Sequence, residues 1–192
     1  MKYTERIHNT IDLVSSLHAN QKRKGSDTPY VSHCFGVAFI LSNYTSDEDI
    51  IIAGLLHDVL EDIPGYTKEK MEEKFGTRVA DLVDNVTGPK EDESGVKMDW
   101  LTAKEIYFNK ISNGSLDALL IVAADKIHNM LSVISLYEEE GDDIWKHFKG
   151  SKEQQRERYS RIFEFIKSKI DNPILEEYEV VLNKFYKITQ ND

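Results

Sequence analysis

One stretch decides the fold of this chain: Ile50-Ile51-Ile52-Ala53-Gly54-Leu55-Leu56-His57-Asp58-Val59-Leu60-Glu61-Asp62. From Ile50 to Leu60 it is apolar nearly all round, which is typical of a helix buried at the centre of a fold. Ser46 is followed three residues later by Asp49, so a capping box is expected at the start of this helix. Pro64-Gly65 is expected to end it.

The hydrophobic pattern outside this stretch is also helical. Apolar residues recur every three or four positions, no segment alternates for long with period two, and no internal repeat is visible. We therefore predict an all-α fold, a bundle of about 8–10 helices by this count of periodic segments. In the helix expected over about 31–43, we predict that Phe35, Ala38 and Phe39 face the core. The expected helices cover about 7–18, 31–43, 50–60, 67–75, 78–87, 101–111, 115–138, 159–170 and 174–188.

Composition excludes several classes of function. The 192 residues include 34 acidic and 24 basic side chains, a formal net charge of −10, which argues against binding to nucleic acid or to an anionic membrane surface. The single cysteine, Cys34, cannot form an intrachain disulfide, so a reducing compartment is expected. The start of the chain has no apolar signal region, and the apolar runs fall short of the ~20 residues of a membrane helix. We expect a soluble cytoplasmic protein with no membrane partner.

Ionisable residues interrupt the two most apolar helices. His57 and Glu61 are four residues apart, as are Asp58 and Asp62, so all four lie near one end of the central helix. A buried carboxylate without a partner costs several kcal/mol or more, so these groups need a cation, hydrogen-bond donors or water. Each feature alone also fits a structural role, since a His-Asp pair is common and a lone histidine often packs in a core.

The joint pattern is more specific. Arg23-Lys24 precedes Pro29-Tyr30-Val31-Ser32-His33, then His57-Asp58 comes with Glu61-Asp62, and Asp125-Lys126-Ile127-His128-Asn129 follows. This pattern resembles the HD-domain metal-dependent phosphohydrolases, and among them the hydrolase domain of RelA/SpoT alarmone enzymes and the small alarmone hydrolases. The resemblance covers residues 1–170, expected to be an HD-type domain. Residues 171–192 carry no motif and are expected to form a C-terminal helix packed on the same domain.

The resemblance implies a role for each residue of the pattern. One divalent metal ion is expected on His33, His57, Asp58 and Asp125. Glu61 and Asp62 are expected to serve the attacking water, while Arg23, Lys24 and Asn129 contact the nucleotide. Two imidazoles with two carboxylates are too rich in oxygen for a structural zinc site and are compatible with Mn²⁺ or Fe²⁺; we expect Mn²⁺.

The leading functional hypothesis is hydrolysis of guanosine 3′,5′-bis(diphosphate), in which the 3′-pyrophosphate is removed to give GDP or GTP and pyrophosphate. A second hypothesis keeps the metal site but changes the substrate to another nucleotide, a deoxynucleoside monophosphate or NADPH. A third is a nucleotide-binding sensor without catalysis, although a mere binder has no need of the Glu61-Asp62 pair. In each case the expected partner is a small nucleotide, and the sequence leaves the oligomeric state open.

Overall fold

The computed structural model describes residues 2–91 and 95–190. In this part of the chain every regular element is helical, apart from two isolated bridges between extended residues, Lys22 with Pro29 and Glu91 with Lys97. The all-α prediction is confirmed. The elements are α1 (Glu5–Leu17), α2 (Val31–Tyr44), α3 (Glu48–Leu56), α4 (Val59–Asp62), α5 (Lys68–Phe75), α6 (Thr77–Val86), α7 (Trp100–Ser112), α8 (Leu116–Glu140), the 3₁₀ helix η1 (Gly141–His147), α9 (Lys152–Lys167) and α10 (Ile174–Thr189).

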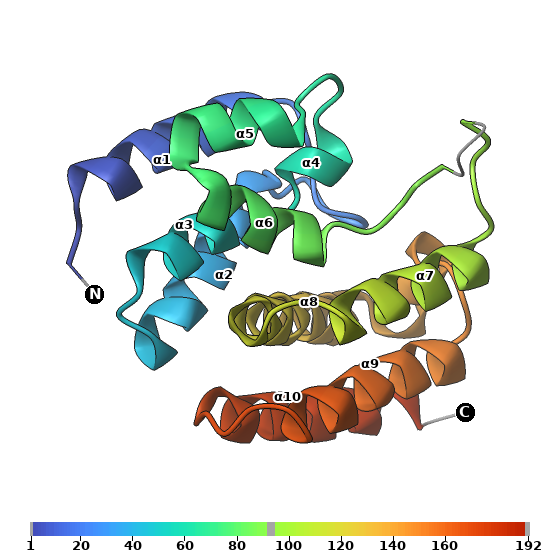
Figure 1. Ribbon diagram of the computed structural model, residues 1–192. Helices are drawn as coiled ribbons and strands as arrows, with labels where there is room; N and C mark the ends of the chain where they lie inside the picture. The colour runs from blue at the N-terminus through green and yellow to red at the C-terminus, as the bar shows by residue number, and fades with distance from the viewer. Residues whose placement is uncertain (1, 92–94, 191–192) are drawn as a thin grey trace.

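Helix α8 forms the centre of the arrangement. It lies between the group made by α1 to α6 on one side and α9 and α10 on the other (Figure 1). Its side chains from Leu119 to Ile127 are almost all buried against both groups. The segment from Leu116 to His147 is long and apolar enough to cross a membrane, but 61% of its most apolar 18-residue window is buried inside the fold. Packing on two sides therefore accounts for its apolar composition.

Helix α3 begins one residue later than the capping-box pattern predicted. Asp47, rather than Ser46, is the N-cap, and its Oδ1 accepts hydrogen bonds from the backbone N–H groups of Asp49 (3.0 Å) and Ile50 (3.4 Å). Arg78 of α6 donates to both carboxylate oxygens of Asp47, at 2.9 and 2.7 Å. The ion pair with Arg78 holds Asp47 in the capping position. A neutral serine could not form this ion pair.

The central helix is broken where the sequence predicted one continuous helix over 50–60. Helix α3 ends at Leu56, the chain turns through His57 and Asp58, and the short α4 begins at Val59. The His57 ring contributes to the turn, because its Nδ1 is 2.8 Å from the carbonyl oxygen of Gly54. Adjacent residues in a straight helix point about 100° apart. The turn lets two consecutive side chains converge on one point.

The inward face of α2 also differs from the prediction at one position. Cys34, Val37, Ala38 and Leu41 are buried, but Phe39 is 71% exposed. The face toward α3 and α8 follows the spacing of residues 34, 37, 38 and 41, and Phe39 lies on the other side of that helix. Close packing of α2 on α3 requires Gly54, where a Cβ would lie 2.3 Å from Leu41 Cδ1.

Candidate active site

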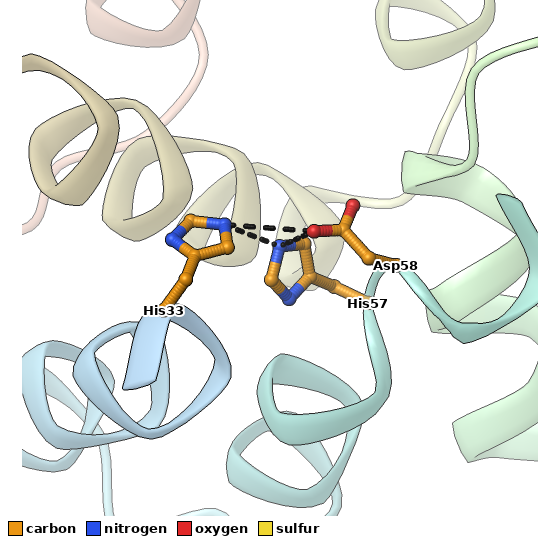
Figure 2. A group of neighbouring side chains, drawn as sticks. All are labelled: His33, His57 and Asp58. Atoms are coloured by element: carbon orange, nitrogen blue, oxygen red, sulfur yellow. Dashed lines mark hydrogen bonds and ion pairs between the residues drawn. The ribbon is translucent and has the colours of Figure 1, made fainter. Parts of the chain in front are cut away.

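Three of the predicted ligands meet at the α3–α4 turn. His33 comes from the first turn of α2, and His57 and Asp58 come from the turn itself (Figure 2). Their candidate ligand atoms all lie within 4.8 Å of one another. His57 Nε2 is 3.1 Å from His33 Nε2 and 2.9 Å from Asp58 Oδ2, while His33 Nε2 is 3.5 Å from the same oxygen. Three donor atoms thus face a single point.

Asp125 reaches the same point from the middle of α8. Its Oδ1 is 3.3 Å from His33 Nε2 and 3.8 Å from His57 Nε2. Two neighbours on α8 hold the carboxylate, because Lys126 Nζ pairs with Oδ2 and Asn129 Nδ2 donates to Oδ1. The structure therefore brings together all four residues that the sequence pattern singled out as a ligand set.

The chemistry of this set fits a divalent cation. Both histidines are buried, and the Nδ1 of His57 is engaged by Gly54 O, which leaves Nε2 directed at the cluster. Burial disfavours a charged imidazole, but the carboxylate of Asp58 outweighs it and raises the pKa of His57 to about 9. Burial likewise opposes ionisation of Asp58, yet the two histidines hold its pKa well below the usual range. The ionised carboxylates thus need positive charge nearby, and a divalent metal ion would supply more of it than protonated histidines do.

Two residues that the motif analysis did not single out as functional support this cluster. Tyr30 Oη donates to Asp58 Oδ2 at 2.5 Å, and His128 Nδ1 lies 3.0 Å from His33 Nδ1. Burial and the charge of His33 lower the pKa of His128 to about 4, so His128 is neutral and can accept a hydrogen bond. Both residues lie inside motifs quoted above, but only the tertiary structure shows which atoms they contact.

The predicted acidic pair lies beside the cluster in two different environments. Glu61 Oε2 accepts one hydrogen bond from the backbone N–H of Gly88 at 3.2 Å. Burial and the charge of Asp58 raise the pKa of Glu61. Asp62 is held by two side chains, because Lys90 Nζ lies 2.5 Å from its Oδ1 and Gln21 Nε2 donates to its Oδ2 at 2.6 Å. The two carboxylates are therefore suited to different tasks.

The predicted nucleotide contacts line one cleft of about 890 Å³ together with the cluster and Glu61. Arg23, in the segment between α1 and α2, donates to Asn129 Oδ1 at 2.7 Å, and its guanidinium lies 5.5 Å from the centre of the Tyr30 ring. Lys24 lines the same cleft. Its pKa is lowered by burial and by the charges of Arg158, Lys149 and Arg23. Arg23, Asn129 and Asp125 thus form a chain of hydrogen bonds that ends at the cluster.

Comparison with known proteins agrees with this geometry. The family model described as the HD domain matches residues 10–154. A guanosine-3′,5′-bis(diphosphate) 3′-pyrophosphohydrolase of Haemophilus influenzae is 37% identical over 130 residues, which cover 65% of this chain and 18% of that protein. The guanosine-3′,5′-bis(diphosphate) 3′-pyrophosphohydrolase MESH1 of Mus musculus is 30% identical over 168 residues, which cover 80% of this chain and 90% of that protein.

Among solved structures, one described as a metazoan ortholog of SpoT that hydrolyses ppGpp superposes with a TM-score of 0.73. It is 25% identical to this chain, and the match covers 97% of both chains. Several of the curated relatives are much longer proteins, and the chain spans only 12% to 18% of the length of four of them.

Proposed function

The chain belongs to the HD-domain family, and from that premise we propose that it is a metal-dependent phosphohydrolase acting on guanosine 3′,5′-bis(diphosphate). The reaction hydrolyses the bond between the ribose 3′-oxygen and the pyrophosphate group, and gives GDP and pyrophosphate. The observation that carries the proposal is the convergence of two histidines and two aspartates beside Glu61, in a cleft that also contains Arg23 and Lys24. The mouse relative, matched over 90% of its length, bears that activity in its name.

We further propose that His33, His57, Asp58 and Asp125 hold one divalent ion, Mn²⁺. The oxygen-rich mixed set suits Mn²⁺ or Fe²⁺ better than zinc. When bound, the ion would lower the pKa of the attacking water and would neutralise charge on the attacked phosphoryl group. The remaining steps belong to side chains of this chain.

Glu61 is the residue that we assign to the proton of the attacking water. A carboxylate with a raised pKa is a better proton acceptor near neutral pH. Glu61 has such a pKa, and among the described residues its side chain accepts one hydrogen bond, from the Gly88 N–H. Asp62 is committed to Lys90 and Gln21. It therefore holds the segment that carries Glu61 and can orient the water without receiving its proton.

Arg23, Lys24 and Asn129 are the residues that we assign to the nucleotide. The planar guanidinium of Arg23 offers a fork for two phosphate oxygens, and Lys24 adds a point charge. Asn129 bridges Arg23 to the ligand Asp125. Substrate and metal site are linked through this bridge.

A release assay tests the proposal. Guanosine 3′,5′-bis(diphosphate), NADPH and deoxynucleoside monophosphates are offered with and without Mn²⁺, and the released phosphate or pyrophosphate is measured. We expect pyrophosphate to be released from guanosine 3′,5′-bis(diphosphate), and only when Mn²⁺ is present. Release of phosphate from NADPH or a deoxynucleoside monophosphate, but not from the bis(diphosphate), would show that the substrate is another nucleotide hydrolysed by the same metal site. Tight nucleotide binding without turnover would indicate a sensor.

The remaining expectations stay as proposals. Residues 1–170 would form the phosphohydrolase domain, and residues 171–192 a C-terminal helix on it; α10 does contact α8 and α9. The partner would be a small nucleotide rather than a nucleic acid or a membrane, and the protein would act in the cytoplasm.

A further inference from the structure

Helices α7 and α9 form a wall of the cleft that has no part in the metal cluster. They lie side by side (Figure 1), joined by the ion pair of Glu105 with Arg161 and by the rings of Phe108 and Phe165, whose centroids are 5.5 Å apart. Lys104 of α7, which directly precedes Glu105, and Arg158 of α9, three residues before Arg161, both line the cleft. We call these two residues the cationic wall.

The cationic wall consists of two basic side chains that form no ion pair with the described acidic residues. Arg158 Nε is buried and has no hydrogen-bond partner among the described residues. Neither Lys104 nor Arg158 forms an ion pair within the part of the chain that the structure describes. Burial, together with the charges of Arg158 and Lys126, lowers the pKa of Lys104 to about 7. Half-buried basic groups that repel one another and lack ion-pair partners are stabilised by a bound anion, so this cluster indicates an anion site.

The nearby basic residues at the metal cluster are already engaged. Lys126 pairs with Asp125, and Arg23 donates to Asn129. The charge of Glu61 reaches Lys104 across the cleft, but the two side chains form no ion pair or hydrogen bond with each other in the part of the chain that the structure describes. The cleft therefore has basic residues on different elements, Arg23 and Lys24 in the segment before α2 and Lys104 and Arg158 on α7 and α9, close enough for the charge of Arg158 to lower the pKa of Lys24.

Basic residues contributed by different elements of one cleft fit a ligand with more than one anionic group. A cleft of about 890 Å³ has room for a whole nucleotide rather than one phosphate group. We propose that the cationic wall binds the 5′-phosphates of the substrate, while the group to be cleaved lies at the metal cluster near Arg23. This inference deepens the proposed function and rests on it for the identity of the nucleotide. It assigns the selectivity for doubly phosphorylated nucleotides to Lys104 and Arg158.

Binding of the product GDP tests the wall without relying on turnover. The full chain, loaded with Mn²⁺, is titrated by calorimetry with GDP and, separately, with guanosine 3′-monophosphate. Lys104→Met and Arg158→Met should each weaken GDP binding about tenfold, the loss expected for one charge-assisted contact. The affinity of the same two variants for guanosine 3′-monophosphate should change less than about twofold. Arg23→Ala should show the opposite preference.

Two further variants and a stability measurement separate an effect on binding from effects on folding and on overall charge. Lys104→Arg keeps the cation and should keep GDP affinity. Lys167→Met removes an exposed cation from α9 outside the cleft and should leave the affinity for both ligands unchanged. Melting temperatures of all variants check that each is folded.

Parallel measurement of hydrolysis distinguishes failure of this inference from failure of the proposed function. Unchanged GDP affinity in both wall variants, or no GDP binding by the unaltered protein, overturns the wall even if guanosine 3′,5′-bis(diphosphate) is hydrolysed. Weakened GDP binding in the variants supports the wall even if that substrate is not hydrolysed, in which case only the proposed reaction fails.

Discussion

The Nδ1 atoms of His33 and His128 lie 3.0 Å apart and join α2 to α8 next to the metal cluster. Since His128 is neutral, its Nδ1 can accept a hydrogen bond from the Nδ1–H of His33. With Nδ1 engaged by His128, His33 Nε2 is directed toward His57 and Asp125. The ring of His128 lies against Gly36, where a Cβ would be 2.1 Å from its Cδ2. A residue of α8 thus contacts and orients the ring of a proposed metal ligand on α2.

Replacement of His128 should weaken metal binding without removing a ligand. Loss of the partner that orients a ligating histidine typically costs about 10–100-fold in metal affinity. We expect His128→Ala to show a loss of that size in a chelator competition titration, and Gly36→Ala to show part of it because it displaces the ring. Ser132→Ala is the matched control, since Ser132 Oγ donates to the His128 carbonyl oxygen and lies 3.4 Å from Nδ1. Equal metal affinity in His128→Ala would show that His33 needs no partner.

Glu61→Gln should separate turnover from binding. The change nearly preserves size but removes the proton acceptor, so kcat should fall about 10²–10⁴-fold while metal content persists. Asp62→Asn should lower kcat less, because Gln21 can still contact the side chain. Glu69→Gln, an exposed change on α5, is the control. Full activity in Glu61→Gln would assign the proton to another group.

Metal affinity should rise with pH. The pKa of His57 is raised to about 9, so the imidazole carries a proton at neutral pH in the absence of metal and must lose it to become a ligand. Apparent affinity should therefore fall about tenfold for each pH unit below that value, with release of about one proton per ion bound. Calorimetric titration with Mn²⁺ in buffers of different ionisation enthalpy measures that proton. A pH-independent affinity would contradict the coupling of His57 with Asp58.

Lys104→Met should stabilise the protein while weakening GDP binding. The pKa of Lys104 falls from 10.5 to about 7 on folding, so the unfolded chain binds more protons between these values. The destabilising contribution of Lys104 is then fully present below about pH 7 and disappears as pH rises toward 10.5. We expect a gain of about 1–3 kcal/mol in the free energy of unfolding near pH 6, shrinking by pH 10. Denaturant titration at both pH values checks it; a loss of stability near pH 6 would refute it.

Arg23→Ala should act on the substrate rather than on the metal. Removing a guanidinium that binds phosphate should raise KM for guanosine 3′,5′-bis(diphosphate) about tenfold or more. Metal content should be unchanged, because Asn129 still donates to Asp125. Lys22→Ala, in the same segment, removes a surface cation paired with Asp27 and should leave KM unaltered. If the kinetics of Arg23→Ala match those of the unaltered protein, Arg23 does not bind the substrate.

Local pattern was sufficient to predict the helical class and most of the helix positions. Apolar residues at helical spacing need a partner surface whatever the topology, so the helices containing Val37, Leu82 and Ile162 follow from the sequence alone. The predicted ligand set rested on the family resemblance, while carboxylates in apolar stretches, such as Asp58 and Asp125, indicated where chemistry should be sought. Both inferences need only neighbouring residues or a motif spread over three segments.

Tertiary packing decided what depends on the relative placement of helices. The break at His57 and Asp58, the exposure of Phe39 and the cap at Asp47 each depend on contacts with another element. The same is true of His128 beside His33 and of Lys104 with Arg158, whose residues are far apart in the chain and share no periodicity. Hydrophobic periodicity records only which side of a helix is buried. The direction in which a polar side chain points, and the charge it meets there, is set by the helix that packs against it.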